Sequence, residues 1–358
     1  MRRALALLTA VPLAAAAGWQ VVVSPPALSF PRDHGAHPSF RSEWWYATGQ
    51  VGAPDGRRFG FQLTFFREGV EPGPPAPGDS ALRARQVLAA HLALGQLGAA
   101  RMRFAERIRR IGDGLAGAAA GDLDVFLDEW LMRRTPDGRI ALAGSDRDSG
   151  IGLRLELAPS GPLVLHGEGG LSRKGPGPGN ASVYVSWTRL AARGTVELDG
   201  RSAPVSGEAW FDHEWGSSQL GVDVEGWDWF GLRLADGRDL MLYRLRRPDG
   251  TATSESSGTL VERYGSMRRL AAADFTVEAR TWWTSPRTHA RYPAVVRVAV
   301  PASGLDLEIR PEIPDSELDG TRSTGTVYWE GPVAVSGSAT GEGYAELTGY
   351  AGSMAGRF

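Results

Sequence analysis

Glu208-Ala-Trp-Phe-Asp-His-Glu-Trp-Gly216 stands just past the middle of the chain, and Gly226-Trp-Asp-Trp-Phe-Gly-Leu232 follows it closely. Together these stretches hold four of the twelve tryptophans, arranged around three consecutive ionisable residues. Aromatic residues favour β-strands because they pack well on a pleated surface. We therefore expect this region to form paired strands and to carry any chemistry that the protein performs.

The three ionisable residues divide between two faces of a strand, since successive side chains point in opposite directions. Asp212 and Glu214 share one face, and His213 shares the other with Phe211 and Trp215. Burial among aromatic rings lowers the pKa of a histidine and keeps it neutral, which suits general acid–base catalysis. We interpret the histidine face as one wall of a lipophilic pocket. A core histidine packed among structural tryptophans is the alternative.

The composition of the chain favours an all-β fold. Glycine (47) and proline (23) are abundant, and short apolar stretches recur between Asp-Gly and Pro-Gly turns. Residues 80–110 differ, because their alanine, leucine and arginine content favours a helix by intrinsic propensity.

Two domains are expected, since 358 residues exceed the size at which one core usually keeps growing. Asp55-Gly-Arg57 and Asp236-Gly-Arg238 each follow an aromatic cluster and precede an apolar strand, as two similar β domains would produce. We place an N-terminal domain at residues 28–216 and a C-terminal domain at residues 217–358.

Residues 1–17 have the features of a Sec-type signal peptide: two arginines, a short apolar run and a small-residue end. The apolar run is too short to span a bilayer, and no other long apolar segment follows. We therefore expect an exported protein, periplasmic or secreted, without an integral membrane segment after cleavage.

Charge and missing motifs exclude several classes of function. A formal net charge of −2 gives no general attraction to nucleic acid or anionic membranes. The absence of cysteine excludes disulfides, thiolate catalysis and cysteine zinc sites. Serine-hydrolase, Walker, His-Glu-x-x-His and dinucleotide motifs are also missing. His34 and His37 could bind a metal only with partners from elsewhere, so we expect neither a metal nor a cofactor.

Further candidates lie near the tryptophans. Tyr243 follows the second Asp-Gly turn, where its phenol could position a water or a substrate hydroxyl; a packed strand tyrosine is the alternative. The candidate catalytic residues are His213, Tyr243 and Asp212. The candidate ligand-binding residues are Glu43, Trp44, Trp45, Trp210, Trp215, Trp227 and Trp229.

Six short motifs carry a resemblance to a known family: Arg32-Asp-His-Gly-Ala-His37, Ser42-Glu-Trp-Trp-Tyr46, Trp210-Phe-Asp-His-Glu-Trp-Gly216, Gly226-Trp-Asp-Trp229, Leu240-Met-Leu-Tyr243 and Leu347-Thr-Gly-Tyr-Ala-Gly352. Together they look like the AttH-type lipocalin-like proteins, which are related to carotenoid 1,2-hydratases and are often called predicted secreted hydrolases. The resemblance runs over essentially the whole mature chain.

This resemblance implies two tandem lipocalin- or calycin-like β-barrels with a lipophilic pocket near their interface. It also implies that residues 80–110 form strands, since tertiary context overrides a weak local propensity. Relatives include cofactor-independent hydratases of isoprenoid or phenolic olefins, and bacterial members commonly accompany ABC-type permeases. We therefore expect a lipophilic small molecule as ligand and an ABC-type permease as a second partner.

Carried over residue by residue, the hydratases' essential histidine, tryptophan and tyrosine match His213, Trp215 and Tyr243. Their proton-donating aspartate, two residues after the tyrosine, matches Leu245. Leucine cannot protonate an olefin, so the resemblance alone does not supply the acid.

Two functions remain open at this point. In the first, the protein is a hydratase or hydrolase in which His213 works with a nearby carboxylate, for which Asp212, Asp228 and Glu43 are the candidates. In the second, it is a periplasmic carrier for lipids or other apolar ligands and performs no chemistry.

Overall fold

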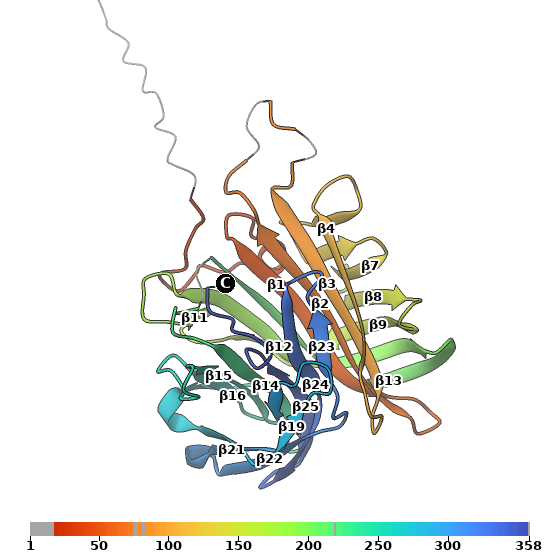
Figure 1. The fold of residues 1–358 in the computed structure, drawn as a ribbon, viewed down its shortest axis with the longest axis vertical. Coiled ribbons are helices and arrows are strands. Elements are labelled where there is room, and N and C mark those ends of the chain that lie inside the picture. Colours follow the sequence, from red (N-terminus) through yellow and green to blue (C-terminus); the bar gives the residue numbers. More distant parts are fainter. Residues whose placement is uncertain (1–17, 75–77, 81–82, 218–219, 357–358) are drawn as a thin grey trace, which may run out of the picture.

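Residues 18–74, 78–80, 83–217 and 220–356 are described by a computed structural model (Figure 1). The predicted signal peptide, residues 1–17, lies outside this part of the chain. Within the described ranges the secondary structure is almost wholly β, which confirms the predicted fold class. The short 3-10 helices found there are η1 (Arg32–His34), η2 (Ala272–Asp274) and η3 (Pro301–Ser303), and no helix of this part is long and apolar enough to cross a membrane.

The first large sheet is antiparallel and curls into a nearly closed barrel, in which β4 approaches β6. In order across the sheet its strands are β4 (Arg103–Arg110), β3 (Gln86–Gln96), β2 (Arg58–Gly69), β1 (Ser42–Gly52), β13 (Arg201–Gly216), β12 (Ala181–Leu198), β9 (Ile151–Pro159), β8 (Ile140–Asp146), β7 (Trp130–Arg134), β6 (Asp124–Leu127) and β5 (Ala116–Ala118), while β10 (Leu163–Leu165) and β11 (Leu171–Arg173) pair with β12.

The second large sheet is also antiparallel and forms a half-barrel. Its strands in order are β17 (Met267–Ala271), β16 (Ser257–Val261), β15 (Asp239–Arg246), β14 (Gly226–Leu234), β25 (Gly341–Leu347), β24 (Thr326–Gly337), β22 (Leu305–Pro311), β21 (Val296–Val300) and β18 (Thr276–Ala279), with β23 (Glu317–Gly320) on β24. A separate pair is formed by β19 (Trp282–Thr284) and β20 (Arg291–Pro293).

Residues 86–96 and 103–110 form the strands β3 and β4, as the family resemblance implied and against their helical propensity. The reason lies in the core of the first barrel. Leu88, Ala90, Leu92 and Leu94 are buried there, and each is two positions from the next. Burial of a period-two face therefore outweighs the local preference for a helix.

The two repeated Asp-Gly-Arg turns form matching hairpins. The first joins β1 to β2, and the second joins β14 to β15. In both turns an aspartate Oδ1 accepts a hydrogen bond of 3.1 Å from the backbone N–H two residues on: Asp55 from Arg57, and Asp236 from Arg238. The predicted hairpins are thus confirmed, and each half of the chain contains one.

The two large sheets meet where β1 and β2 lie against β24 and β25 (Figure 1). The side-chain amide of Gln50 donates to the carbonyls of Val333 and Gly343, at 3.0 and 3.1 Å. Gly60 lies so close to Pro332 that a Cβ there would stand 2.6 Å from the proline ring. These contacts fix the spacing of the sheets at one side of the space between them.

Candidate functional site

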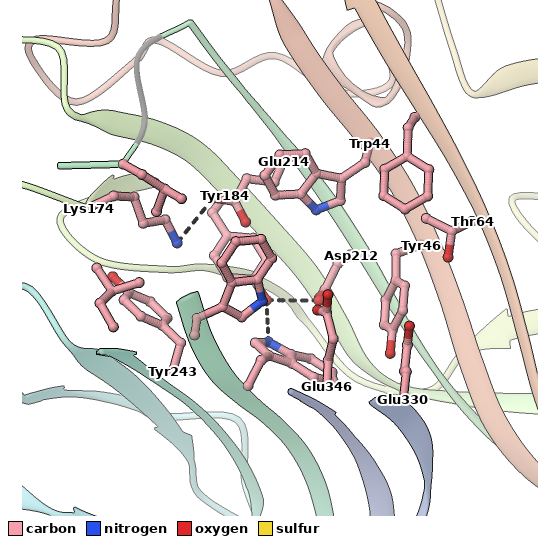
Figure 2. A pocket seen from close by; sticks show the side chains of 15 residues that line it. Trp44, Tyr46, Thr64, Lys174, Tyr184, Asp212, Glu214, Tyr243, Glu330 and Glu346 are labelled. Carbon is pink, nitrogen blue, oxygen red and sulfur yellow. Dashed lines mark hydrogen bonds and ion pairs between the residues drawn. The ribbon is translucent and has the colours of Figure 1, made fainter. Parts of the chain in front are cut away.

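A cavity of about 100 Å³ lies between the two sheets (Figure 2). The wall is mostly aromatic or aliphatic, yet it contains four carboxyl groups and one amino group. The residues that line it are Trp44, Tyr46, Thr64, Phe66, Lys174, Tyr184, Asp212, Glu214, Leu220, Trp227, Trp229, Tyr243, Leu245, Glu330 and Glu346.

Strand β13 sends its carboxylates into this cavity and its histidine away from it. Asp212 and Glu214 line the cavity, whereas His213 does not. The predicted alternation is therefore present, but the cavity wall is the carboxylate face, where we had expected the histidine face. The pairing of β1 with β13 explains this, because it sets Trp44 beside Glu214 and Tyr46 beside Asp212 on the side that meets the second sheet.

Asp212 is held by a set of hydrogen-bond donors. Its Oδ2 accepts from the Tyr184 hydroxyl at 2.8 Å, and its Oδ1 accepts from Trp210 Nε1 at 2.6 Å and from the Ser186 hydroxyl. Ser186 in turn contacts Nε2 of the buried His166 at 2.7 Å. Burial raises the pKa of Asp212 to about 7, although the three donors oppose this rise. A carboxyl with such a pKa can exchange a proton near neutral pH.

Lys174 is the only lysine of the chain, and its ammonium group projects into the cavity (Figure 2). Its Nζ lies 3.1 Å from Glu214 and 3.9 Å from the centre of the Tyr243 ring. Burial lowers the pKa of Lys174, but the Glu214 carboxylate more than offsets this, so the pKa is raised overall. The Tyr243 hydroxyl donates to the carbonyl of Arg173 at 3.1 Å. Tyr243 thus offers its ring face to a cation inside the cavity.

Glu330 and Glu346 enter the cavity from the second sheet. They are opposite each other in the antiparallel register of β24 and β25. Burial and the neighbouring charge of Glu346 raise the pKa of Glu330 well above its usual value. Burial also raises the pKa of Glu346, to about 7, although Trp227 opposes this rise. The second sheet therefore adds two carboxyl groups that favour the protonated form.

His213 lies on the opposite face of β13 and contacts Glu43. One oxygen of Glu43 lies 2.9 Å from His213 Nε2 and 2.8 Å from His37 Nδ1, and the other accepts from Arg67 Nε at 2.8 Å. Burial alone would raise the pKa of Glu43, but the two histidines and the charge of Arg67 lower it well below its usual range. Burial lowers the pKa of His213, although Glu43 opposes this.

These groups are also the best candidates for metal ligands in the described part of the chain. Ligand atoms of His37, Glu43 and His213 all lie within 4.8 Å of one another. However, both oxygens of Glu43 already accept hydrogen bonds, and the buried guanidinium of Arg67 contacts one of them. A second cation would lie close to this guanidinium. We therefore interpret this cluster, called the buttress below, as a structural network of hydrogen bonds among His37, Glu43, Arg67 and His213. It joins the N-terminal segment to β1 and β13.

The predicted tryptophans divide between the two faces in the same way. Trp44, Trp227 and Trp229 line the cavity. Trp45 stacks on His213 with ring centres 5.0 Å apart, and Trp215 stacks on His37 at 3.8 Å, so both pack against the buttress. Trp210 lines no part of the cavity but donates to Asp212.

Of the three carboxylates proposed to replace the missing acid, only Asp212 lines the cavity. Asp228 is engaged elsewhere, since it contacts the guanidinium groups of Arg244 and Arg246 at 2.7 and 3.0 Å. Glu43 belongs to the buttress. Leu245 itself lies in the cavity wall, where by resemblance the hydratases carry their acid.

A second cavity of about 470 Å³ adjoins the first. The two share Trp44, Phe66, Trp227 and Glu346 in their walls. The second is more polar and includes the buried His91, whose Nδ1 lies 2.7 Å from the Tyr328 hydroxyl. Glu346 can therefore be reached from both sides.

Ten of the fifteen lining residues were not among the predicted site residues, and five of these carry a hydroxyl, amino or carboxyl group central to the site: Tyr46, Lys174, Tyr184, Glu330 and Glu346. A weak signal was present for three of them. Lys174 is the only lysine in a chain rich in arginine, Glu330 follows Tyr328-Trp329, and Glu346 stands between Ala345 and Leu347. Nothing in the sequence shows that these positions meet across two sheets.

Comparisons with known proteins agree with this fold. The sequence profile of the AttH-like family matches residues 21–350. The structure is similar to that of an AttH from Nitrosomonas europaea, with 38% identity, a TM-score of 0.84, and coverage of 92% of this chain and 99% of that one. It also shares its fold with kievitone hydratase from Nectria haematococca, with 13% identity, a TM-score of 0.69, and coverage of 93% and 96%. Among curated proteins, none matches the sequence. The chain belongs to the AttH-like family, as its motifs suggested.

Proposed function

We propose that the protein adds water to a lipophilic olefin that binds in the cavity between the two sheets. One observation carries this proposal: Asp212 and Glu346, whose pKa values burial raises to about 7, line the same mainly aromatic cavity. A general acid or base works best when its pKa lies near the working pH. The same groups would also serve the hydrolysis of an acid-labile bond.

The chemistry needs only a carboxylic acid, a water molecule and an apolar surface. The acid transfers its proton to one olefin carbon, so an O–H bond breaks, a C–H bond forms, and the neighbouring carbon becomes a cation. The rings of Trp227 and Trp229 stabilise this cation by cation–π attraction. Water then attacks the cation and releases a proton to a carboxylate, for which Asp212 is positioned by its three donors.

His213 acts as a positioning residue in this scheme. Together with Glu43 and Arg67 it fixes β13 and β1 from the face opposite the cavity. The alternation of β13 then determines where Asp212 and Glu214 point. We expect His213→Gln to change substrate binding and stability more than the proton-transfer step.

Incubation with isoprenoid and phenolic olefins, one at a time in ¹⁸O-labelled water, tests the proposal. Mass spectrometry should detect a product that carries one labelled water. Asp212→Asn should lower turnover by about 100-fold or more. Glu129→Gln is the control, because Glu129 is exposed and pairs only with groups outside the cavity. Failure of every olefin to react, with intact folding, would refute hydration.

A carrier without chemistry is the second candidate, and Leu245 in the cavity wall favours it. A carrier needs the apolar volume but no acid at that position. Native mass spectrometry of the purified protein separates the two functions. An unmodified bound lipid would support the carrier, and a pair of compounds that differ by one water would support the enzyme.

We further propose that the protein is exported and acts beside an ABC-type permease. Residues 1–17 support export by their composition. N-terminal sequencing of protein recovered from the periplasm should show loss of this segment. Crosslinking in the native host should capture a permease subunit, and retention of Met1 on cytoplasmic protein would argue against both.

A further inference from the structure

Glu330 and Glu346 form a cross-strand pair of carboxyl groups inside the cavity. They are directly opposite each other in the register of β24 and β25, so both side chains leave the sheet on the same face. Both line the cavity, and Figure 2 shows Glu346 extending toward Asp212 and Glu330 extending alongside Tyr46. Side chains at such positions have Cβ atoms about 5 Å apart. Two carboxylates at this separation repel each other in an apolar setting.

In the part of the chain that the structure describes, no cation compensates this pair. Neither glutamate takes part in an ion pair there, and the ammonium group of Lys174 is bonded to Glu214. Glu330 is only 1% exposed and its Oε1 accepts no hydrogen bond from the described residues, although Tyr46 and Gln62 partly oppose the rise in its pKa that burial causes. An ionised Glu330 would thus be a buried charge with an unsatisfied oxygen, which is costly. A proton on the pair removes this cost.

Asp212 has the opposite arrangement, although it lies in the same cavity. Its two oxygens accept three hydrogen bonds, from Tyr184, Trp210 and Ser186. These donors stabilise the ionised form of Asp212. Glu330 has an oxygen, Oε1, that accepts no hydrogen bond in the described part of the chain and can carry a proton. Asp212 is therefore suited to accept a proton, and the Glu330–Glu346 pair is suited to donate one.

We propose that Glu330 and Glu346 share one proton in neutral solution and that this pair is the acid that protonates the bound olefin. The proposal rests on the proposed hydratase function. The shared O–H bond breaks as the C–H bond forms, and the pair is left with two negative charges that favour the nearby carbocation. The attacking water releases a proton to Asp212. Transfer of this proton from Asp212 to the Glu330–Glu346 pair regenerates the acid.

The position of the pair explains how the chain can lack the acid at Leu245. Leu245, Glu330 and Glu346 all line the same cavity, on three strands of the second sheet. Glu346 also lines the second cavity, so water can reach it without passing the ligand. This gives the pair a route for reprotonation that a sealed carboxyl would lack.

Infrared spectroscopy of the full-length mature protein tests the shared proton without any substrate. Because the pKa of Asp212 is also about 7, the comparison is made in an Asp212→Asn background. At neutral pH this protein should show a protonated-carboxyl band, and both Glu330→Gln and Glu346→Gln should remove it. Glu129→Gln is the matched control, since its exposed carboxylate pairs with Arg107, which lowers its pKa, and its loss should leave the band unchanged. Absence of the band, or its survival in both cavity variants, would overturn the proposal.

A second measurement needs no variant and covers the case in which a variant does not fold. Carbon-13 NMR of wild-type protein labelled at glutamate carboxyls should show two coupled titrations, one below and one above neutral pH, as for two carboxyls that share a site. Independent titrations in the usual range would refute sharing. Donation is tested with an olefin that reacts under the conditions above, where both variants should lower turnover at least about 100-fold.

These results distinguish the two proposals. A shared proton without hydration of any olefin would refute the function and the donor role together, while the proton-sharing pair would stand. Hydration by a protein without the infrared band would refute the pair and leave the function intact. Hydration that both glutamine variants retain would show that another group is the acid.

Discussion

Glu43 and Glu330 are both glutamates with 1% exposure, and their surroundings give them opposite properties. Glu43 receives hydrogen bonds or charge from Arg67, His37 and His213, which lower its pKa far below the usual value. Glu330 faces Glu346 and a free volume, and burial raises its pKa far above the usual value. Burial alone therefore does not decide the charge of a carboxyl in this protein.

The difference shows how one strand pair serves two purposes. On one face of β1 and β13, an ionised carboxylate is fully bonded and holds the N-terminal segment in place. On the other face, carboxyl groups remain available for proton exchange. The charge of Glu43 is compensated and supports the fold, whereas the cavity carboxyls that we propose to exchange protons form no ion pair among the described residues.

The largest expected effect is the loss of stability in Glu43→Gln. This variant leaves the fully buried guanidinium of Arg67 without its counter-charge. Breaking a buried pair in this way typically costs about 3–5 kcal/mol. Urea denaturation monitored by tryptophan fluorescence should show the loss. A cost below about 1 kcal/mol would mean that Glu43 does not support the buttress.

The pH dependence of stability should show the cavity acids. A carboxyl group whose pKa is higher in the folded than in the unfolded protein stabilises the fold at pH values below the unfolded pKa. This contribution is lost as the pH rises through the folded pKa. For Glu346 these values are 4.5 and about 7, so the free energy of unfolding should fall across that window. In Glu346→Gln the fall should be smaller, by on the order of 1 kcal/mol. Identical slopes for wild type and variant would contradict the raised pKa.

Glu43 should act in the opposite direction at lower pH. Its pKa is depressed, so its contribution is present above about 4.5 and is lost as pH falls. Acid denaturation of the wild type should therefore begin at a lower pH than that of Glu43→Gln, which lacks this contribution. Following the tryptophan fluorescence of both proteins from pH 2 to 5 tests this.

Tyr243→Phe should have a moderate effect. It removes the hydrogen bonds of the hydroxyl to Arg173 and Ser172 but keeps the ring face beside Lys174. The expected loss of stability is about 1 kcal/mol. Retention of ligand binding would show that the ring matters more than the hydroxyl. Abolished binding in a stable variant would instead assign the hydroxyl to the ligand.

The smallest effect on stability is expected for Glu330→Gln. Glutamine has nearly the same shape as protonated glutamic acid and removes the repulsion toward Glu346. We expect a change within about 1 kcal/mol, or a slight gain near pH 7. A loss as large as that of Glu43→Gln, in the same denaturation assay, would show that Glu330 is ionised and compensated after all.

Much of the fold could be predicted from the sequence. The Asp-Gly-Arg turns marked two places where an aromatic cluster is followed by an apolar strand, and both are hairpins in the structure. Residues 80–110 were ambiguous by propensity, because alanine and leucine are common in helices and in barrel cores. Only the family resemblance favoured strands there.

The site was predictable in part. Alternation correctly separated His213 from Asp212 and Glu214, but it could not show which face meets the second sheet. That depends on the contacts of β1 and β2 with β24 and β25, between segments more than 250 residues apart. Glu330 and Glu346 stayed unnoticed for the same reason, since their proximity to β13 arises only in the folded chain. The catalytic roles of His213 and Tyr243 stay predictions.

The contact of Gly60 with Pro332, together with the hydrogen bonds of Gln50 across the junction, sets the width of the cavity from outside it. None of these residues lines the space that a ligand would fill. Substitutions where the two sheets contact each other can therefore change the size of the cavity while the residues that line it stay the same. Divergence in substrate range need not leave a trace among the lining residues.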